Sequence, residues 1–310
     1  MKTRINLNTC RNNLCKTNCN KSDRKFNSED DLCKITHSEL DSLPIRCVGS
    51  WAEQKIYMLS QYFGIFATGM KNKWETNYIE ICSGPGRCVN RKDGTEFDGT
   101  PMAILKHPAF KYIHKALFFD YNRTVVSTLN SRIQNLKIVN ACAYQGDYNN
   151  PDEILEIIKQ DCSIGRSLNL VLIDPTDCSV PFKMVNKIKQ TLQKVDMIIN
   201  IATGTDLNRN LPMAFENPDY AQKYNNFLGN NTFFVDPKNI NLFKQGNYEE
   251  LRNNFRNLYQ KSMEEIGYSV FRIKSVRHYY NLLFAASHER AAEFWDKAQR
   301  IQYDGQRTLF

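Results

Sequence analysis

The stretch Tyr78-Ile79-Glu80-Ile81-Cys82-Ser83-Gly84-Pro85-Gly86-Arg87 decides the fold of this chain. It begins as a short apolar run that carries one acid, and a turn with two glycines follows at once. Because glycine has no Cβ, such a turn lets backbone N–H groups approach a ligand closely. A glycine turn after the first strand of an α/β sheet is where nucleotide-like cofactors bind. The stretch therefore predicts a first strand followed by a cofactor loop.

Downstream of this loop, apolar strands alternate with helices. The pattern predicts strands over 115–120, 137–141, 168–173 and 195–201, with helices over 100–105, 122–129, 151–159 and 180–192. Near-continuous apolar strands separated by helices are typical of a parallel sheet that is buried on both faces. The predicted fold class is therefore α/β, with a doubly wound, mostly parallel sheet.

The two ends of the chain extend this core. A helix is expected over 51–70, and two strands over 268–276 and 279–286 form an antiparallel pair at one sheet edge. The asparagine-rich segment from 204, with the helix 248–266, is predicted as an insertion of loops and helices after the fifth strand. A last helix is expected over 292–301. We divide the chain into a cysteine-rich N-terminal extension, residues 1–49, and a Rossmann-like domain, residues 50–310.

Acids follow the predicted strands in a fixed order. This order resembles that of S-adenosylmethionine-dependent methyltransferases, in which successive acids lie near the amino-acid part, the ribose and the adenine of the cofactor. The end of the fourth strand then faces the methyl group. The resemblance predicts catalytic positions at Asp174 and Pro175. It predicts a cofactor site formed by Glu80, Cys82, Ser83, Gly84, Gly86, Asp120 and Asp147.

Three details separate this chain from related patterns. The third glycine of a dinucleotide loop is missing, and no Gly-Lys-Ser/Thr motif for a P-loop is present. Cys82 stands where methyltransferases have their first glycine. A cysteine is tolerated in this place if its φ is negative, because only a positive φ demands glycine. Asp174-Pro175 lacks the second proline and aromatic residue that stack a flipped base in amine-methylating enzymes. Cys82 and Cys178 are alternative candidates for a nucleophilic thiol.

Composition constrains the partners. The chain has 310 residues, 42% hydrophobic content and a net charge of +8, which favours nucleic acid or another polyanion as a partner. No apolar run approaches the roughly 20 residues of a membrane helix, and the polar N-terminus lacks a secretory signal. We therefore expect a cytoplasmic protein without a membrane contact.

Half of the ten cysteines lie within the first 47 residues. Their clustering suggests a zinc site, because tetrahedral zinc favours soft thiolate ligands and can order a short segment. The predicted metal ligands are Cys10, Cys15, Cys19 and Cys33. An iron–sulfur cluster fits the spacing less well, and the alternative is a tail with incidental cysteines.

The chain also resembles the three-Cys-motif partner proteins, a methyltransferase-like Rossmann family. The matching stretches are 43–51, 66–74, 78–88, 98–103, 173–175, 226–229, 280–287, 294–295 and the end Gly305-Gln306-Arg307-Thr308-Leu309-Phe310. The resemblance implies a fold of this type and a partner that is a radical iron–sulfur protein.

Three functions follow as hypotheses. The first is a methyltransferase that uses S-adenosylmethionine and acts on nucleic acid, in RNA or DNA modification or defence. The second is a non-catalytic partner protein that binds a nucleotide-like ligand. The third is a methyltransferase for a peptide or metabolite that works with a radical iron–sulfur enzyme.

Overall fold

A seven-stranded sheet forms the centre of the computed structural model, which describes residues 3–4, 37–90, 94–276 and 279–300. The strands of this sheet are β3 (Glu75–Ile81), β6 (Ile113–Asp120), β7 (Ala141–Gln145), β8 (Ser167–Ile173), β9 (Val195–Ile201), β10 (Val270–Val276) and β11 (Tyr280–Ala286). Their spatial order is β10-β11-β9-β8-β3-β6-β7.

Five of these strands are parallel, and the last two are not. β3 pairs in parallel with both β6 and β8, whereas β11 runs antiparallel to β9 and to β10. In chain order the sheet is therefore 3-2-1-4-5-7-6, and the direction of winding reverses between β3 and β8. The predicted doubly wound sheet with its C-terminal antiparallel pair is confirmed. A ligand site is expected beside the reversal, at the carboxyl ends of the strands.

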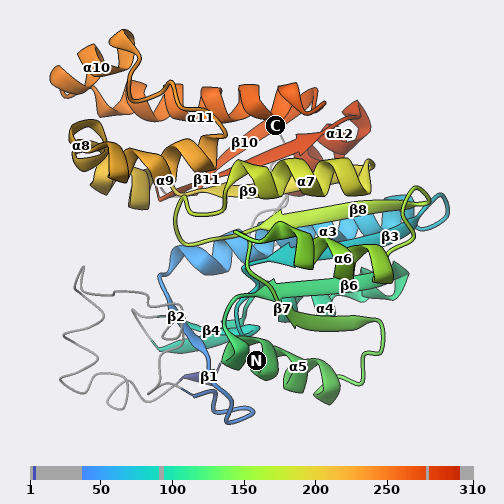
Figure 1. Cartoon of the computed structure of the whole chain (residues 1–310). Coiled ribbons are helices and arrows are strands. Elements are labelled where there is room, and N and C mark those ends of the chain that lie inside the picture. The colour runs from blue at the N-terminus through green and yellow to red at the C-terminus, as the bar shows by residue number, and fades with distance from the viewer. Residues whose placement is uncertain (1–2, 5–36, 91–93, 277–278, 301–310) are drawn as a thin grey trace.

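Helices cover both faces of this sheet because successive strand residues point to opposite sides. Ile79 and Ile81 pack on the face covered by α6 (Pro151–Asp161), α7 (Phe182–Leu192), α9 (Pro218–Leu228) and α11 (Tyr248–Glu265). Tyr78 packs on the opposite face, covered by α3 (Trp51–Met70), α4 (Thr100–Leu105), α5 (Arg123–Asn135) and α12 (Glu289–Gln299). In Figure 1, α6 and α7 lie in front of the sheet and α3 lies behind it.

A second, four-stranded sheet was not predicted from the sequence. It has the order β1 (Thr3–Arg4), β5 (Thr95–Asp98), β4 (Arg87–Asn90), β2 (Arg46–Val48). Its strands are short, and fully buried Glu96 lies in one of them. Arg87 and Ser38 both donate hydrogen bonds to this carboxylate. A charged residue argues against a buried strand when only the local sequence is considered. Here the partners that allow its burial come from other segments.

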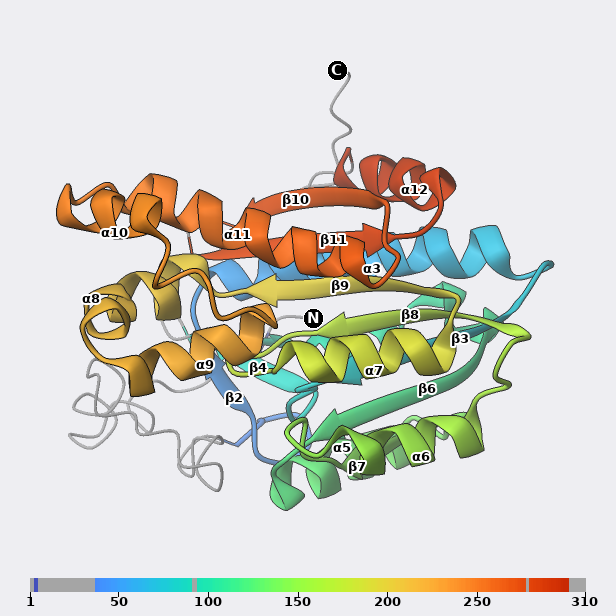
Figure 2. The ribbon, with the colours of Figure 1, turned by 45° about the horizontal axis from the view of Figure 1, so that its top comes forward.

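The insertion after the fifth strand forms a cluster of helices. It runs from a π-helical turn, η2 (Thr203–Leu207), through α8 (Asn208–Glu216), α9 and α10 (Pro237–Lys244) to α11. In Figure 2 the arrowheads of β6, β8 and β9 point toward the side on which α8, α9 and α10 lie. The insertion therefore extends the molecule at the edge where the parallel strands end.

One predicted strand is misplaced. We expected the third strand over 137–141, but β7 covers Ala141–Gln145. Lys137 has a φ of +57°, and Val139 is 95% exposed, so the apolar stretch after α5 is a turn and loop. The last helix begins at Glu289 instead of 292. Within the described residues, no helix is both long enough and apolar enough to cross a bilayer.

Candidate active site

The glycine loop follows β3, and Cys82 stands in the place of its first glycine. Cys82 has a φ of +66°, in the left-handed region, so the negative φ that would make a cysteine unstrained here is not adopted. The backbone at Cys82 thus has a conformation that glycine adopts easily. For a residue with a Cβ, such as cysteine, this conformation is strained.

The two glycines of the loop have different local reasons to be glycine. Gly84 has a φ of +69°, and a Cβ there would meet only the Arg46 side chain, at 3.6 Å. Gly86 has a φ of +92°, and a Cβ there would lie 2.9 Å from Met102 and 3.0 Å from Leu129. A side chain at position 86 would therefore collide with the core, whereas a side chain at position 84 would meet only Arg46.

Asp120 ends β6 and holds the loop. Its Oδ2 accepts the Gly84 N–H at 3.0 Å, and its Oδ1 accepts the Asn122 N–H at 3.1 Å. Each carboxylate oxygen has a second lone-pair site. The carboxylate can therefore keep both backbone contacts and still accept hydrogen bonds from ribose hydroxyls, the role predicted for it.

Glu80 lies on β3 and is enclosed on the face covered by α3. The Tyr78 hydroxyl donates to its Oε2 at 2.8 Å. Burial raises the pKa of the Glu80 carboxyl well above its usual value, and the nearby carboxylates of Asp174 and Asp120 act in the same direction. Tyr78 and Lys55 oppose this pKa shift without cancelling it. The buried Glu80 carboxyl therefore holds its proton more tightly than an exposed one, and its predicted contact with the cofactor stays a prediction.

The loop has an uncommitted polar group. The Ser83 hydroxyl is buried and has no hydrogen-bond partner among the described residues, although the Ser83 N–H donates to the Phe119 carbonyl at 3.0 Å. A buried hydroxyl without a partner is costly and calls for a ligand or water. Partly buried Asp147 follows β7, where its Oδ1 accepts the Asn149 N–H at 2.8 Å. A ligand at this loop can therefore bond with the Ser83 hydroxyl and approach the backbone at Gly84, as an S-adenosylmethionine site requires.

Asp174, just after β8, is part of a buried ion pair. Lys55 Nζ, from the first part of α3, lies 2.7 Å from its Oδ1 and 2.6 Å from its Oδ2. Asn200 Nδ2 donates to Asp174 Oδ1 at 2.9 Å and to the Pro175 carbonyl at 3.0 Å. The Lys55 and Asp174 side chains are only 11% and 13% exposed. Both predicted catalytic groups therefore already have partners.

The charge state of Lys55 follows from this pairing. Burial works against a charged amine, but the charge and hydrogen bonds of Asp174, together with Tyr280 and Cys88, raise the pKa of the Lys55 ammonium above its usual value. Lys55 is therefore an ammonium at neutral pH. It also lies 5.4 Å from the centre of the Tyr280 ring, at the start of β11.

Sequence analysis missed Lys55 and Asn200, although both leave a signal. Lys55 falls on the apolar stripe of α3, since Leu59 is four residues and Tyr62 seven residues further on. A lone charge on a buried stripe indicates a partner. Asn200 is a polar residue in an apolar stretch of β9, one residue before the carboxyl end of that strand, where a ligand site is expected.

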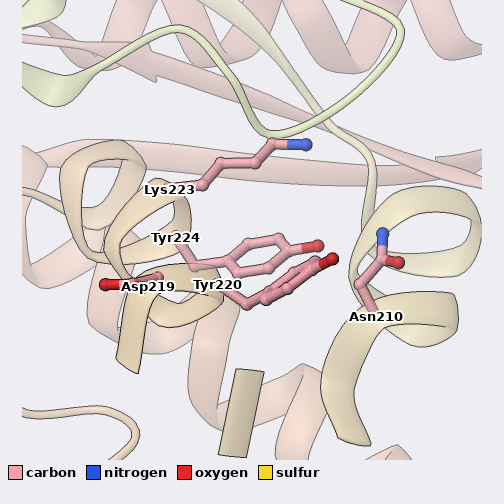
Figure 3. Close-up of a pocket in the computed structure, with 5 residues that line it drawn as sticks. All are labelled: Asn210, Asp219, Tyr220, Lys223 and Tyr224. Carbon is pink, nitrogen blue, oxygen red and sulfur yellow. The ribbon is translucent and has the colours of Figure 1, made fainter. Parts of the chain in front are cut away.

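The insertion forms a hollow of about 290 Å³, lined by Asn210, Asp219, Tyr220, Lys223 and Tyr224. In Figure 3 the two tyrosine rings lie next to each other with their hydroxyls toward Asn210, and Asp219 points away. Lys223 Nζ contacts Asp177 Oδ2 at 2.8 Å and Asp206 Oδ2 at 2.9 Å. The hollow is thus tied to the loops that follow β8 and β9.

The candidate thiols are poorly suited to nucleophilic attack. Burial raises the pKa of the Cys82 and Cys178 thiols well above the usual value, so both are neutral thiols. His288 accepts the Arg290 N–H at 3.1 Å as a helix cap, which is a structural role.

The predicted metal ligands Cys10, Cys15, Cys19 and Cys33 lie outside the described residues. Among the residues that are described, no group of three or more His, Cys, Asp or Glu side chains could hold a metal ion. The zinc site at the four cysteines stays a prediction from the sequence.

Buried Arg132 on α5 links the glycine loop to the segment before α3. Its guanidinium contacts both carboxylate oxygens of Asp41, at 2.7 and 3.0 Å. It also donates to the carbonyls of Leu43 at 3.3 Å, Pro44 at 3.0 Å and Pro85 at 2.5 Å. Pro85 lies between the two loop glycines, so a single side chain positions the loop and this segment.

No protein-family model matches this chain, and no curated protein matches it. Solved structures similar to it include a SAM-dependent methyltransferase from Aquifex aeolicus, with 12% identity and a TM-score of 0.37, covering 76% of this chain and 98% of that one. Magnesium protoporphyrin IX methyltransferase from Synechocystis PCC 6803, with bound SAH, has 13% identity and a TM-score of 0.39, covering 77% and 84%. Because these scores are low, the fold assignment rests on the strand order.

The 3-2-1-4-5-7-6 sheet with its antiparallel seventh strand defines an α/β protein with the fold of class I S-adenosylmethionine-dependent methyltransferases.

Proposed function

We propose that this protein is an S-adenosylmethionine-dependent methyltransferase that acts on nucleic acid in the cytoplasm. The observation that carries the proposal is the half of the sheet edge formed by β3, β6 and β7. There Gly84, the Asp120 carboxylate and the Ser83 hydroxyl, which has no partner in the described part of the chain, lie at the carboxyl ends of neighbouring strands. Such a set suits a cofactor with hydroxyl groups and a polar tail.

The residues of the chain have separate tasks in this proposal. Ser83, Gly84 and Asp120 would hold the cofactor, with Asp147 at its far end. When bound, the cofactor supplies a methyl group on a positively charged sulfur. The protein contributes position and the exclusion of water, which are the main sources of rate in such a transfer.

The nucleic-acid substrate is supported by the net charge of +8. The insertion does not carry this excess, because residues 203–266 hold seven basic and eight acidic side chains. The charge therefore comes from the rest of the chain. The resemblance to the three-Cys-motif partner proteins supports the same fold and suggests a radical iron–sulfur protein as a partner.

Calorimetry with S-adenosylmethionine tests the proposal. We expect micromolar binding that Asp120→Ala weakens at least 10-fold, because two loop contacts and a ribose acceptor are lost together. Asp120→Asn keeps an oxygen for the Gly84 N–H and separates the two effects. No binding at millimolar cofactor would refute the proposal. Binding without transfer to RNA, DNA or a peptide would favour the non-catalytic partner.

Metal analysis of anaerobically purified protein tests the predicted cysteine site. We expect about one zinc per chain, lost when Cys15 and Cys19 are replaced by serine.

A further inference from the structure

The Lys55–Asp174 pair lies directly beside the glycine loop, on the half of the sheet edge formed by β8, β9 and β11, and the Asp174 N–H donates to the Ile81 carbonyl at 3.2 Å. Lys55 reaches from Asp174, after β8, to the Tyr280 ring at the start of β11. Asn200, on the strand β9 between them, completes the group. If the cofactor lies over β3, β6 and β7, as in the proposed function on which this inference rests, this group faces the methyl acceptor.

The hydrogen-bonding groups here suit one kind of acceptor. The lone pair of an exocyclic amine is delocalised into the ring of the base, so that nitrogen accepts poorly from the Lys55 ammonium, which lies 2.6 Å from Asp174 Oδ2. The Lys55 ammonium offers only donors. A hydroxyl group has two lone pairs and one proton. It can accept from Lys55, donate to Asp174 and still direct a lone pair at the methyl carbon.

Within a nucleic acid, this chemistry selects the sugar. Internal nucleotides of DNA have no free hydroxyl group, whereas each ribose of RNA has its 2′-hydroxyl. The pair thus decides between RNA and DNA, which the net charge alone does not separate.

An aromatic surface adjoins the ammonium. Trp51 lies four residues before Lys55 in α3, on the same face of the helix. Its ring stacks on Tyr279, with centroids 4.2 Å apart and an interplanar angle of 24°. Tyr279 is exposed. Single-stranded bases stack on aromatic side chains of this kind.

We propose that Lys55 and Asp174 are catalytic residues for methylation of a ribose 2′-hydroxyl of RNA. Lys55 holds the acceptor oxygen, and Asp174 takes the hydroxyl proton. A lone pair of that oxygen forms the new C–O bond, and the electrons of the broken C–S bond stay on the sulfur of S-adenosylmethionine. The products are the 2′-O-methyl ribose, a neutral thioether and a protonated Asp174.

Product analysis of the unmodified chain tests this directly. The protein is incubated with S-adenosylmethionine carrying a labelled methyl group and with either protein-free total RNA or sheared genomic DNA. Each nucleic acid is then digested to nucleosides. We expect label in 2′-O-methyl nucleosides of RNA and none in DNA. Label on base nitrogens overturns the proposal. Cofactor binding by calorimetry with no label in RNA also overturns it, while absent cofactor binding refutes the proposed function itself.

Variants separate chemistry from structure. We expect Lys55→Met to lower kcat about 100-fold or more, within the range of a lost catalytic hydrogen bond, while the dissociation constant of S-adenosylmethionine stays within twofold. Lys55→Arg keeps a cation beside Asp174, so a folded protein with at least 10-fold lower kcat is expected. A large loss of cofactor affinity in either variant would instead make Lys55 a cofactor ligand.

A binding ratio gives a readout without turnover. Fluorescence anisotropy compares an oligoribonucleotide with the oligodeoxyribonucleotide of the same sequence. We expect about fivefold tighter binding of RNA, the size of one net hydrogen bond, and a ratio near one for Lys55→Met. Lys159→Met is the matched control, since exposed Lys159 pairs with Glu156 on α6. An unchanged ratio in Lys55→Met would contradict contact with the hydroxyl.

Discussion

The carboxyl edge of the sheet has two halves that differ in how their polar side chains are bonded. One half is formed by β3, β6 and β7 with the glycine loop, and the other by β8, β9 and β11. On the glycine-loop half, the Ser83 hydroxyl has no hydrogen-bond partner among the described residues, and a Cβ at Gly84 would meet only the Arg46 side chain. On the other half, Asp174 is held by Lys55 and Asn200, and Lys223 joins Asp177 to Asp206. The first half keeps polar groups free for a ligand, whereas the second has its charges paired before a ligand arrives. Pairing fixes the geometry of groups that act on a reacting atom.

The largest effect on cofactor affinity is expected from a side chain added at the glycine loop. Gly84→Val places a β-branched side chain at a φ of +69°, on the side that faces the ligand. We expect the dissociation constant of S-adenosylmethionine to rise about 100-fold or more, with a stability loss of about 1–2 kcal/mol from the left-handed backbone.

Gly165→Val is the matched control for this change. Gly165 has a φ of +84° with no atom within 4 Å of an added Cβ, and it lies in the turn before β8, at the opposite edge. Calorimetry should find the same affinity as in the wild type. Equal loss of affinity in both variants would mean that general instability, and not the loop, is responsible.

The paired half is tested by a double-mutant cycle. Lys55→Met, Asp174→Asn and their combination should give a coupling free energy of about 2–3 kcal/mol in urea unfolding, because breaking a buried pair leaves one charge uncompensated. The control cycle uses Lys159 and Glu156, which are 48% and 64% exposed and should couple by less than about 0.5 kcal/mol. Similar coupling in both cycles would end the distinction between the halves.

A carboxyl without a cation at contact distance gives the contrast to Asp174. Asp196 lies at the amino end of β9, and the Tyr62 hydroxyl donates to it at 3.2 Å. Burial raises the pKa of Asp196 to about 7, although Tyr62 and the charge of Lys189 oppose the shift. The folded state thus binds this proton more tightly than the unfolded state, so wild-type stability falls as pH rises from about 4 to 7.

Asp196→Asn should remove this dependence. Between pH 5 and pH 8 we expect the variant to gain about 2 kcal/mol relative to the wild type, since each unit of pKa shift corresponds to about 1.4 kcal/mol. Urea unfolding at the two pH values measures it. A constant difference between the two proteins across this range would show that Asp196 does not titrate there.

The smallest effect is expected at the hollow. Lys223 is 35% exposed, so Lys223→Met should cost about 1 kcal/mol or less, despite two carboxylate partners. Lys238→Met removes a 3.9 Å contact between exposed side chains and should cost nothing measurable. Thermal unfolding of both variants ranks them, and a cost for Lys223→Met near that of Lys55→Met would mean that the hollow is as firmly built as the ion pair.

The sequence predicts the open half better than the paired half, for a physical reason. Glu80 and Asp120 lie at the carboxyl ends of β3 and β6, and Gly84 lies in the turn after β3, so local patterning locates them. Lys55 and Asp174 are 119 residues apart, and nothing local connects them. The same limit applies to Arg87 and Glu96, whose pairing makes a buried strand out of a charged segment.

Local apolar patterns also give a wrong prediction where the apolar residues are exposed to solvent. Ile138 and Val139 have the composition of a strand, yet Val139 is 95% exposed because α5 ends in a turn at Lys137. By contrast, α3, α4 and β9 have the predicted bounds, since the apolar residues of the helices face the core and β9 is a near-continuous apolar run that is buried throughout.

The Arg132 contacts have a consequence for motion. Because one guanidinium holds Asp41, the carbonyls of Leu43 and Pro44, and the carbonyl of Pro85, the glycine loop and the segment before β2 cannot open independently. They form one cooperative unit of local unfolding. In native-state hydrogen exchange, the amides of Leu43 and Gly84 should therefore share one opening free energy. A cofactor that closes on the loop would slow exchange in a segment it never touches.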